Sequence, residues 1–258
     1  MVKKTKKKLK NIDYFNFNKG TLLLVIGVIL SVFTLISKLV FGTIEIIYYA
    51  QIFGCLLIYF GLILHLVFIG DKPFFKSWKY IQESKKFIYA AISVFLFFAL
   101  IGFLIPAPGF LKENILKIIY EIIQRTAGMS QAELISFIFL NNLQSSFFGI
   151  MLGFFFGIFP VISAIFNGYL LGFVSSYTVQ EEGFFYLWRL FPHGIFELPA
   201  VFISFGLGIR FGSLLLKKNK KKFFRYFLFN SLRTFVLIII PLLIISALIE
   251  GSLIFLFD

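Results

Sequence analysis

Charged residues are scarce in this sequence. Only 14% of its 258 residues are charged, with 12 acidic side chains in all, whereas 59% are hydrophobic. Because about a quarter of the residues in a soluble domain are charged, the composition predicts an integral membrane protein. The lone cysteine, Cys55, excludes an internal disulfide and a cysteine metal cluster. Two histidines leave few ligands for any other metal centre.

The basic residues are unevenly distributed. A net charge of +13 would suggest nucleic-acid binding in a soluble protein, but here the charges form blocks at residues 3–19, 72–86 and 217–225 that flank apolar runs. The cytoplasmic loops of membrane proteins carry an excess of Lys and Arg. We therefore place these blocks, with 18 of the 25 basic residues, in the cytoplasm. We expect contact with anionic lipid headgroups and no nucleic-acid partner.

Apolar runs of bilayer-spanning length recur along the chain. About 20 helical residues cross the hydrocarbon core, and five runs reach or approach this length: 21–40, 46–69, 87–105, 193–216 and 235–256. A longer region, 143–179, is interrupted by Pro160. Because both inner basic blocks should face the cytoplasm, this region holds either two short spans meeting near residues 159–163 or a re-entrant hairpin.

The predicted fold is an all-α bundle of about seven transmembrane helices in the cell membrane, with the N-terminus in the cytoplasm and the C-terminus outside. Residues 1–20 form a basic tail and 21–258 one transmembrane domain, with an N-terminal helix pair at 21–70 and a core at 87–258. The first apolar run exceeds a signal-peptide core in length and lacks a cleavage site, so we expect it to be retained.

The segment between residues 112 and 133 is amphipathic. Isoleucines recur at helical spacing on the face opposite Lys117 and Glu121. This pattern predicts a helix that lies on the outer membrane interface or packs on the bundle. A second short helix should begin after Ser130, because Glu133 three residues later completes a capping-box pattern.

Glycines and amides are concentrated between the amphipathic segment and the next span. Asn141 and Asn142 precede the predicted fourth span, where they either cap a helix or face the interior. Asn167 falls within the fifth span and should face another helix, since an unpaired amide in hydrocarbon is costly. Glycines at a spacing of four allow close helix packing, within the bundle or across a homodimer: Gly149, Gly153, Gly157, Gly168 and Gly172.

A histidine and a glutamate interrupt the apolar stretch RLFPHGIFELPAV at residues 189–201. Pro192 suits the first turn of a helix. Gly194 narrows that helix, and Pro199 can kink it. The residues that follow His193 on the same face are polar or small, so this face should point into the protein: Glu197, Ala200, Ser204 and Gly208.

Three roles are open for His193 and Glu197. Their spacing suits two metal ligands, but a site needs three or four and His65 is the only other histidine. A catalytic pair would resemble part of a zinc protease helix, yet an HEXXH motif is absent. The third role is a buried hydrogen-bonded pair that fixes helices near the outer interface. A proton or substrate relay in a polar cavity is the remaining alternative, because intramembrane ionisable residues are functional candidates. We expect no cofactor and no enzymatic activity.

Residues 141–212 resemble the core of the stage II sporulation protein M family of integral membrane proteins. The resemblance rests on paired asparagines, spaced glycines, an Asn-Gly pair and a Pro-His-Gly-x-x-Glu-x-x-Ala pattern. It marks the following positions: Asn141, Asn142, Gly149, Gly153, Asn167, Gly168, Pro192, His193, Gly194, Glu197 and Ala200. Family members in sporulating bacteria are implied to anchor a cell-wall hydrolase complex that drives engulfment, without being hydrolases.

Two functions are expected from these features. The first is a non-enzymatic scaffold or anchor, itself a homo-oligomer, with envelope or membrane protein partners. The alternative is a transporter or channel for a small molecule, ion or lipid, with its polar site around His193 and Glu197, because transporters place sites at interrupted helices. No inverted repeat is evident in the sequence.

Overall fold

The computed structural model describes residues 22–23, 25–33, 50, 53–54, 57–59, 61, 72–105, 107–185, 187, 191–217 and 219–257, without the side chains of 191–193 and 257. The chain divides into two compact units, Met1–Lys76 and Ser77–Asp258. The basic tail, Cys55, His65 and most of the two predicted spans at 21–40 and 46–69 lie outside the described residues. Most of the described residues therefore belong to the second unit.

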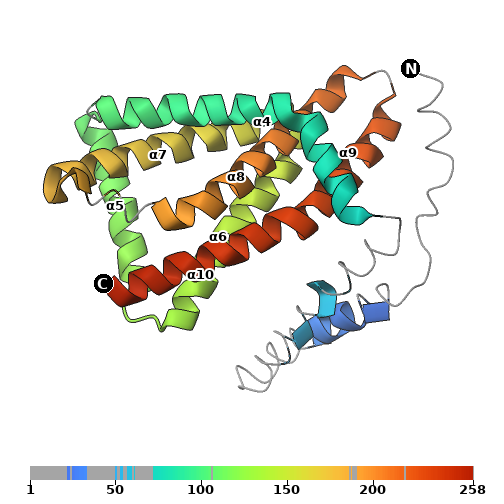
Figure 1. Ribbon diagram of the computed structural model, residues 1–258, viewed down its shortest axis with the longest axis horizontal. Helices are drawn as coiled ribbons and strands as arrows, with labels where there is room; N and C mark the ends of the chain where they lie inside the picture. Colours follow the sequence, from blue (N-terminus) through green and yellow to red (C-terminus); the bar gives the residue numbers. More distant parts are fainter. Residues whose placement is uncertain are drawn as a thin grey trace. The chain divides into compact units, whose positions relative to one another are not determined.

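The described part of the second unit is helical, with no strand (Figure 1). Its long helices are α4 Pro73–Leu104, α5 Gly109–Thr126, α6 Gln131–Met151, α7 Ile158–Glu182, α8 Phe191–Gly212, α9 Lys220–Thr234 and α10 Ile240–Phe257. Short 3₁₀ segments, η1 Leu152–Phe154 and η3 Ser213–Leu216, follow α6 and α8, and the π-helical segment η4 Phe235–Ile239 joins α9 to α10.

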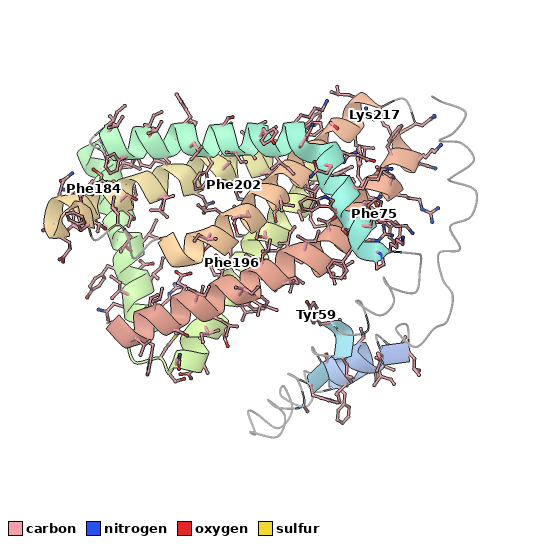
Figure 2. All side chains as sticks on the ribbon, viewed as in Figure 1. Tyr59, Phe75, Phe184, Phe196, Phe202 and Lys217 are labelled. Carbon is pink, nitrogen blue, oxygen red and sulfur yellow. The ribbon has the colours of Figure 1, made fainter. Side chains whose placement is uncertain are left out.

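Among the described residues, five helices are long and apolar enough to cross a membrane: Pro73–Leu104, Gln131–Phe154, Ile158–Glu182, Gly194–Leu216 and Lys220–Leu256. The predictions of an all-α fold and of a membrane protein are therefore confirmed. Large apolar side chains also point away from the helices, where a bilayer would cover them (Figure 2): Leu100 on α4, Phe166 on α7 and Phe255 on α10, for example, are each more than half exposed.

The region 143–179 contributes to two separate helices, α6 and α7, but their junction was predicted too late in the chain. The break lies at 155–157, where Phe156 and Gly157 adopt φ values of 58° and 72°. Glycine accepts this left-handed conformation at little cost. Pro160 instead lies in the first turn of α7. Residues there donate no intrahelical hydrogen bond, so the lack of an N–H on proline does not weaken the helix.

Several helices are longer than the apolar runs suggested. α4 begins at Pro73 and carries the second basic block from Lys76 on, and α9 carries the third from Lys220 on and continues through η4 into the last span. Lysine and glutamate are good helix formers, so the helices extend beyond their apolar parts. The π segment precedes Pro241, which cannot donate the α-helical hydrogen bond to Leu237.

The short helix expected after Ser130 is not a separate element. It forms the first turns of α6, which continues without a break to Met151. The capping box at its start is confirmed: Ser130 accepts from the Glu133 N–H at 3.4 Å, and the Ser130 N–H donates to Glu133 Oε2 at 2.8 Å. Asn141 and Asn142 lie well inside α6 and do not cap it.

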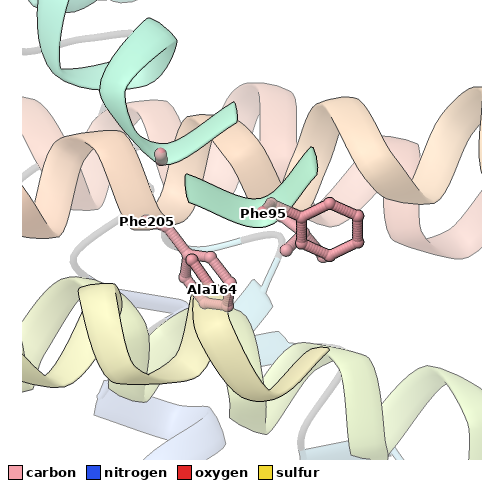
Figure 3. Close-up of a cluster of buried hydrophobic side chains, with 5 residues drawn as sticks. Phe95, Ala164 and Phe205 are labelled. Carbon is pink, nitrogen blue, oxygen red and sulfur yellow. The ribbon is translucent and has the colours of Figure 1, made fainter. Parts of the chain in front are cut away.

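The core lies where α8 passes between its neighbours α6, α7 and α10. One buried cluster joins α4, α7 and α8 (Figure 3) and comprises Ala91, Phe95, Ala164, Val201 and Phe205. A second cluster, Leu134, Ile138 and Ala247, joins α6 to α10. The first cluster packs α8 against α4 and α7, and the second packs α6 against α10.

Two helix crossings are so close that only glycine fits. A Cβ atom on Gly153 in η1 would overlap the backbone of Gly208, and one on Gly208 would overlap the carbonyl of Gly149, so α8 touches the backbones of η1 and α6. Gly168 and Gly172 bring α7 equally close to the backbone of α4, and Figure 1 shows these two helices side by side. Glycine permits such approach and the dispersion contacts that it brings.

Candidate functional site

Glu197 on α8 meets two polar residues from neighbouring helices. The side chain of Asn142 on α6 lies near enough to the Glu197 carboxylate to interact with it. Glu250 on α10 is near enough to Glu197 for a direct electrostatic interaction. Oε2 of Glu250 is buried and has no hydrogen-bond partner within the part of the chain that the structure describes. We call Asn142, Glu197 and Glu250 the carboxylate cluster.

The helix face of Glu197 explains how this carboxylate enters the bundle. Further along the same face, Ala200, Ser204 and Gly208 are all buried. The Ser204 hydroxyl donates to the Ala200 carbonyl at 2.8 Å, so its hydrogen bond is satisfied within α8. Of the residues on this face whose side chains the structure describes, Glu197 is the one with a polar group left to interact with α6 and α10. Two acids that meet in a membrane segment can bind a proton or a small cation between them.

Other residues predicted for this site lie elsewhere. Asn167 is exposed on α7 and donates from Nδ2 to the Ser163 carbonyl at 2.8 Å, so the expectation that it faces another helix is wrong. Its amide is satisfied by its own helix and needs no second one. Asn141 is exposed on α6, and the side chain of His193 lies outside the described residues.

Gly194 lies in a more open environment than the other glycines of α8. A Cβ atom there would meet only Leu198 Cδ1, at 3.8 Å, among the described atoms. This distance is an ordinary van der Waals contact, so Gly194 does not mark a close crossing of the kind found at Gly208.

A second polar cluster, which was not predicted from the sequence, joins α4, α8 and α9. Arg210 donates from Nη1 to Ser84 Oγ at 2.6 Å and to the Tyr80 carbonyl at 3.2 Å, and from Nη2 to Glu83 Oε2 at 3.3 Å. Its guanidinium also lies 4.4 Å from the centre of the Tyr80 ring. The Tyr226 hydroxyl donates to the same Glu83 oxygen at 2.7 Å. We call these residues the arginine cluster.

The two clusters lie far apart on α8. Glu197 and Arg210 are thirteen residues apart, which is about 20 Å along a helix. Arg210 lies in the same apolar run as Glu197, and Glu250 lies in the last apolar run. The signal that identified Glu197, an ionisable residue within an apolar run, could therefore have identified the other two. The part of the chain that is described contains no group of three histidine, cysteine or acidic residues placed to hold a metal ion.

Comparison with known proteins gives a match over most of this unit. A family model described as stage II sporulation protein M matches residues 91–253, from the middle of α4 to near the end of α10. An uncharacterized protein of Methanocaldococcus jannaschii is 31% identical over 141 residues, which cover 52% of this chain and 62% of the relative. The alignment thus spans less than two thirds of the relative's length. No solved structure matches the chain.

Proposed function

Because the chain belongs to the stage II sporulation protein M family, we propose that it is a non-enzymatic scaffold or anchor for a membrane or envelope complex. The observation that supports this proposal is the close packing of α8. Gly208 touches the backbone of α6 and Gly206 that of α4, and Ala200, Phe205 and Leu207 are fully buried. A closely packed bundle holds its outer surfaces in fixed positions, which suits a docking platform.

The proposed orientation places both inner basic blocks in the cytoplasm. Four candidate spans separate the start of α4 from the start of α9, so both starts lie on the same side of the membrane if each span crosses it. In this arrangement the N-terminus is cytoplasmic, the C-terminus and α5 are outside, and anionic headgroups contact the basic blocks. The glycine crossings act as a zipper within the chain, and other surfaces form a homo-oligomer.

The α5 helix is the proposed outer docking element. Only Ile115 of its apolar residues is buried, whereas Ile118 and Ile122 are 53% and 45% exposed. These side chains can enter the membrane interface or contact a partner.

Crosslinking in native membranes, followed by affinity purification of the full chain, tests the scaffold. We expect a stoichiometric partner protein, with at least tenfold less of it recovered for Ile118→Asn/Ile122→Asn. Lys112→Gln, an exposed change on the same helix, is the control and should recover as much partner as the unchanged chain. Recovery of the chain without any other protein would refute the scaffold proposal.

The carboxylate cluster favours one alternative, a transporter that binds a proton or a cation between Glu197 and Glu250. Proteoliposomes with a pH-sensitive or a sodium-sensitive dye inside provide the test. A transporter would carry a flux that Glu250→Gln abolishes and that Glu113→Gln, an exposed change on α5, leaves intact. Proteoliposomes without any flux for the unchanged chain would remove this alternative.

A further inference from the structure

A pocket of about 370 Å³ lies where η3 leads into α9. Its volume is within the range of ligand-binding pockets, roughly 300–1,000 Å³. The walls are apolar and come from η1, η3 and α9: Phe154, Leu214, Leu215 and Phe224. Three basic residues of α9 complete the lining with the apolar parts of their side chains, so their charged ends lie at its rim: Lys220, Lys221 and Arg225. We call this the basic pocket.

Aromatic packing fixes the walls of the basic pocket. The ring centres of Phe154 and Phe224 are 5.8 Å apart, and Phe211 lies 5.8 Å from the first and 5.5 Å from the second. Contacts at these separations are typical of favourable aromatic pairs. Nearby, Phe156 and Leu216 are 73% and 88% exposed. The pocket is therefore formed without a ligand and has apolar surface around it.

The basic residues stand at an unusual place on their helix. Lys220 and Lys221 lie in the first turn of α9, which contains no acidic residue, and the Asn219 side chain does not cap it. The first N–H groups of a helix lack intrahelical partners, and this end is the positive end of the helix dipole. Neither lysine has an ion-pair partner among the described residues. An anion here would offset both the positive charges and the open N–H groups.

We propose that the basic pocket binds one anionic phospholipid. A hydrocarbon chain lies against the apolar walls, and the phosphate accepts hydrogen bonds from Lys220, Lys221 and Arg225. Free phosphate would leave the walls in contact with water, and a neutral lipid would offer Lys220 and Lys221 no counter-ion. This inference rests on the proposed contact between the basic blocks and anionic lipid, and assigns that contact to one site.

The full chain in nanodiscs provides the test. The discs contain phosphatidylcholine with a minority of phosphatidylglycerol of the same chains, and native mass spectrometry counts the lipid that stays bound. We expect one retained phosphatidylglycerol per chain. Removing all three charges with Lys220→Gln/Lys221→Gln/Arg225→Gln should weaken retention roughly a hundredfold, about fivefold for each charge.

Two further variants separate the site from general charge. Lys79→Gln/Lys85→Gln/Lys86→Gln removes three exposed lysines of α4 outside the pocket and should retain phosphatidylglycerol like the unchanged chain. Leu215→Trp fills the pocket and keeps every charge, and it should lose the lipid. Circular dichroism verifies that each variant keeps its helices.

Three results would overturn the basic pocket as the lipid site. Full retention by the α9 variant or by Leu215→Trp would exclude it. Equal losses for the α9 and α4 variants would refute the single site while leaving general binding of the basic blocks in place. Displacement of the lipid by glycerol 3-phosphate, which has the phosphate but no chain, or equal retention of phosphatidylcholine would refute an anionic phospholipid as the ligand.

Discussion

Alanine at Gly208 is expected to force α6 and α8 apart. The added Cβ would overlap the carbonyl oxygen of Gly149 and come within 3.1 Å of Pro160 Cγ. The first of these atoms belongs to the backbone of the neighbouring helix, which cannot rotate away as the end of a side chain can. The two helices would therefore have to separate where they are now in direct contact.

The magnitude combines two opposing effects. Overpacking a buried contact costs about 1–3 kcal/mol, and backbone overlap belongs at the upper end of this range. Alanine gains about 1 kcal/mol over glycine in a helix interior. The expected net loss for Gly208→Ala is therefore about 2 kcal/mol in the free energy of unfolding, which corresponds to roughly a thirtyfold change in the folding equilibrium.

Gly194→Ala is the matched control on the same helix. Its new Cβ meets only Leu198 Cδ1 at 3.8 Å among the described atoms, so the propensity gain should remain and stabilise the protein by up to about 1 kcal/mol. SDS titration of the purified protein, followed by far-UV circular dichroism, measures both variants. If Gly208→Ala unfolds at the same SDS fraction as Gly194→Ala, the backbone contact of α6 and α8 contributes nothing to stability.

Two other side-chain interactions can be tested with the same titration. Ser130→Ala removes the N-cap of α6 and should cost roughly 0.5–2 kcal/mol, whereas Ser136→Ala, an exposed serine further along that helix, should cost less; equal losses would contradict the capping role. Arg210→Gln and Glu83→Gln, combined in a double-mutant cycle, should show a coupling of about 0.5–1 kcal/mol, because the Glu83 side chain is 38% exposed and partly screened. A coupling of zero would contradict a stabilising ion pair.

Local features of the helices could be predicted because their causes lie close together in the sequence. The capping box at Ser130 involves residues three positions apart. Helix bounds were less predictable, since apolar runs mark only the lipid-covered part of a helix, and the polar residues of α4 and α9 continue the same helices outside it.

The polar clusters needed information that the sequence does not express locally. Ser84 and Arg210 are 126 positions apart, and the Tyr80 and Ser231 hydroxyls, which lie 3.2 Å apart, are separated by 151 positions. The polar and small residues that follow His193 on one face correctly indicated an inward face of α8. It could not indicate that Asn142 and Glu250 meet Glu197, or that Asn167 faces outward.

The sequence was enough to predict a helical membrane protein of the stage II sporulation protein M family, because apolar length, charge blocks and short motifs are properties of consecutive residues. The packed fold was needed to see which carboxylates meet, which glycines touch a backbone and where the basic pocket opens. These features depend on how helices are rotated and paired, and such pairing is set by complementary packing between distant segments rather than by the composition of either one.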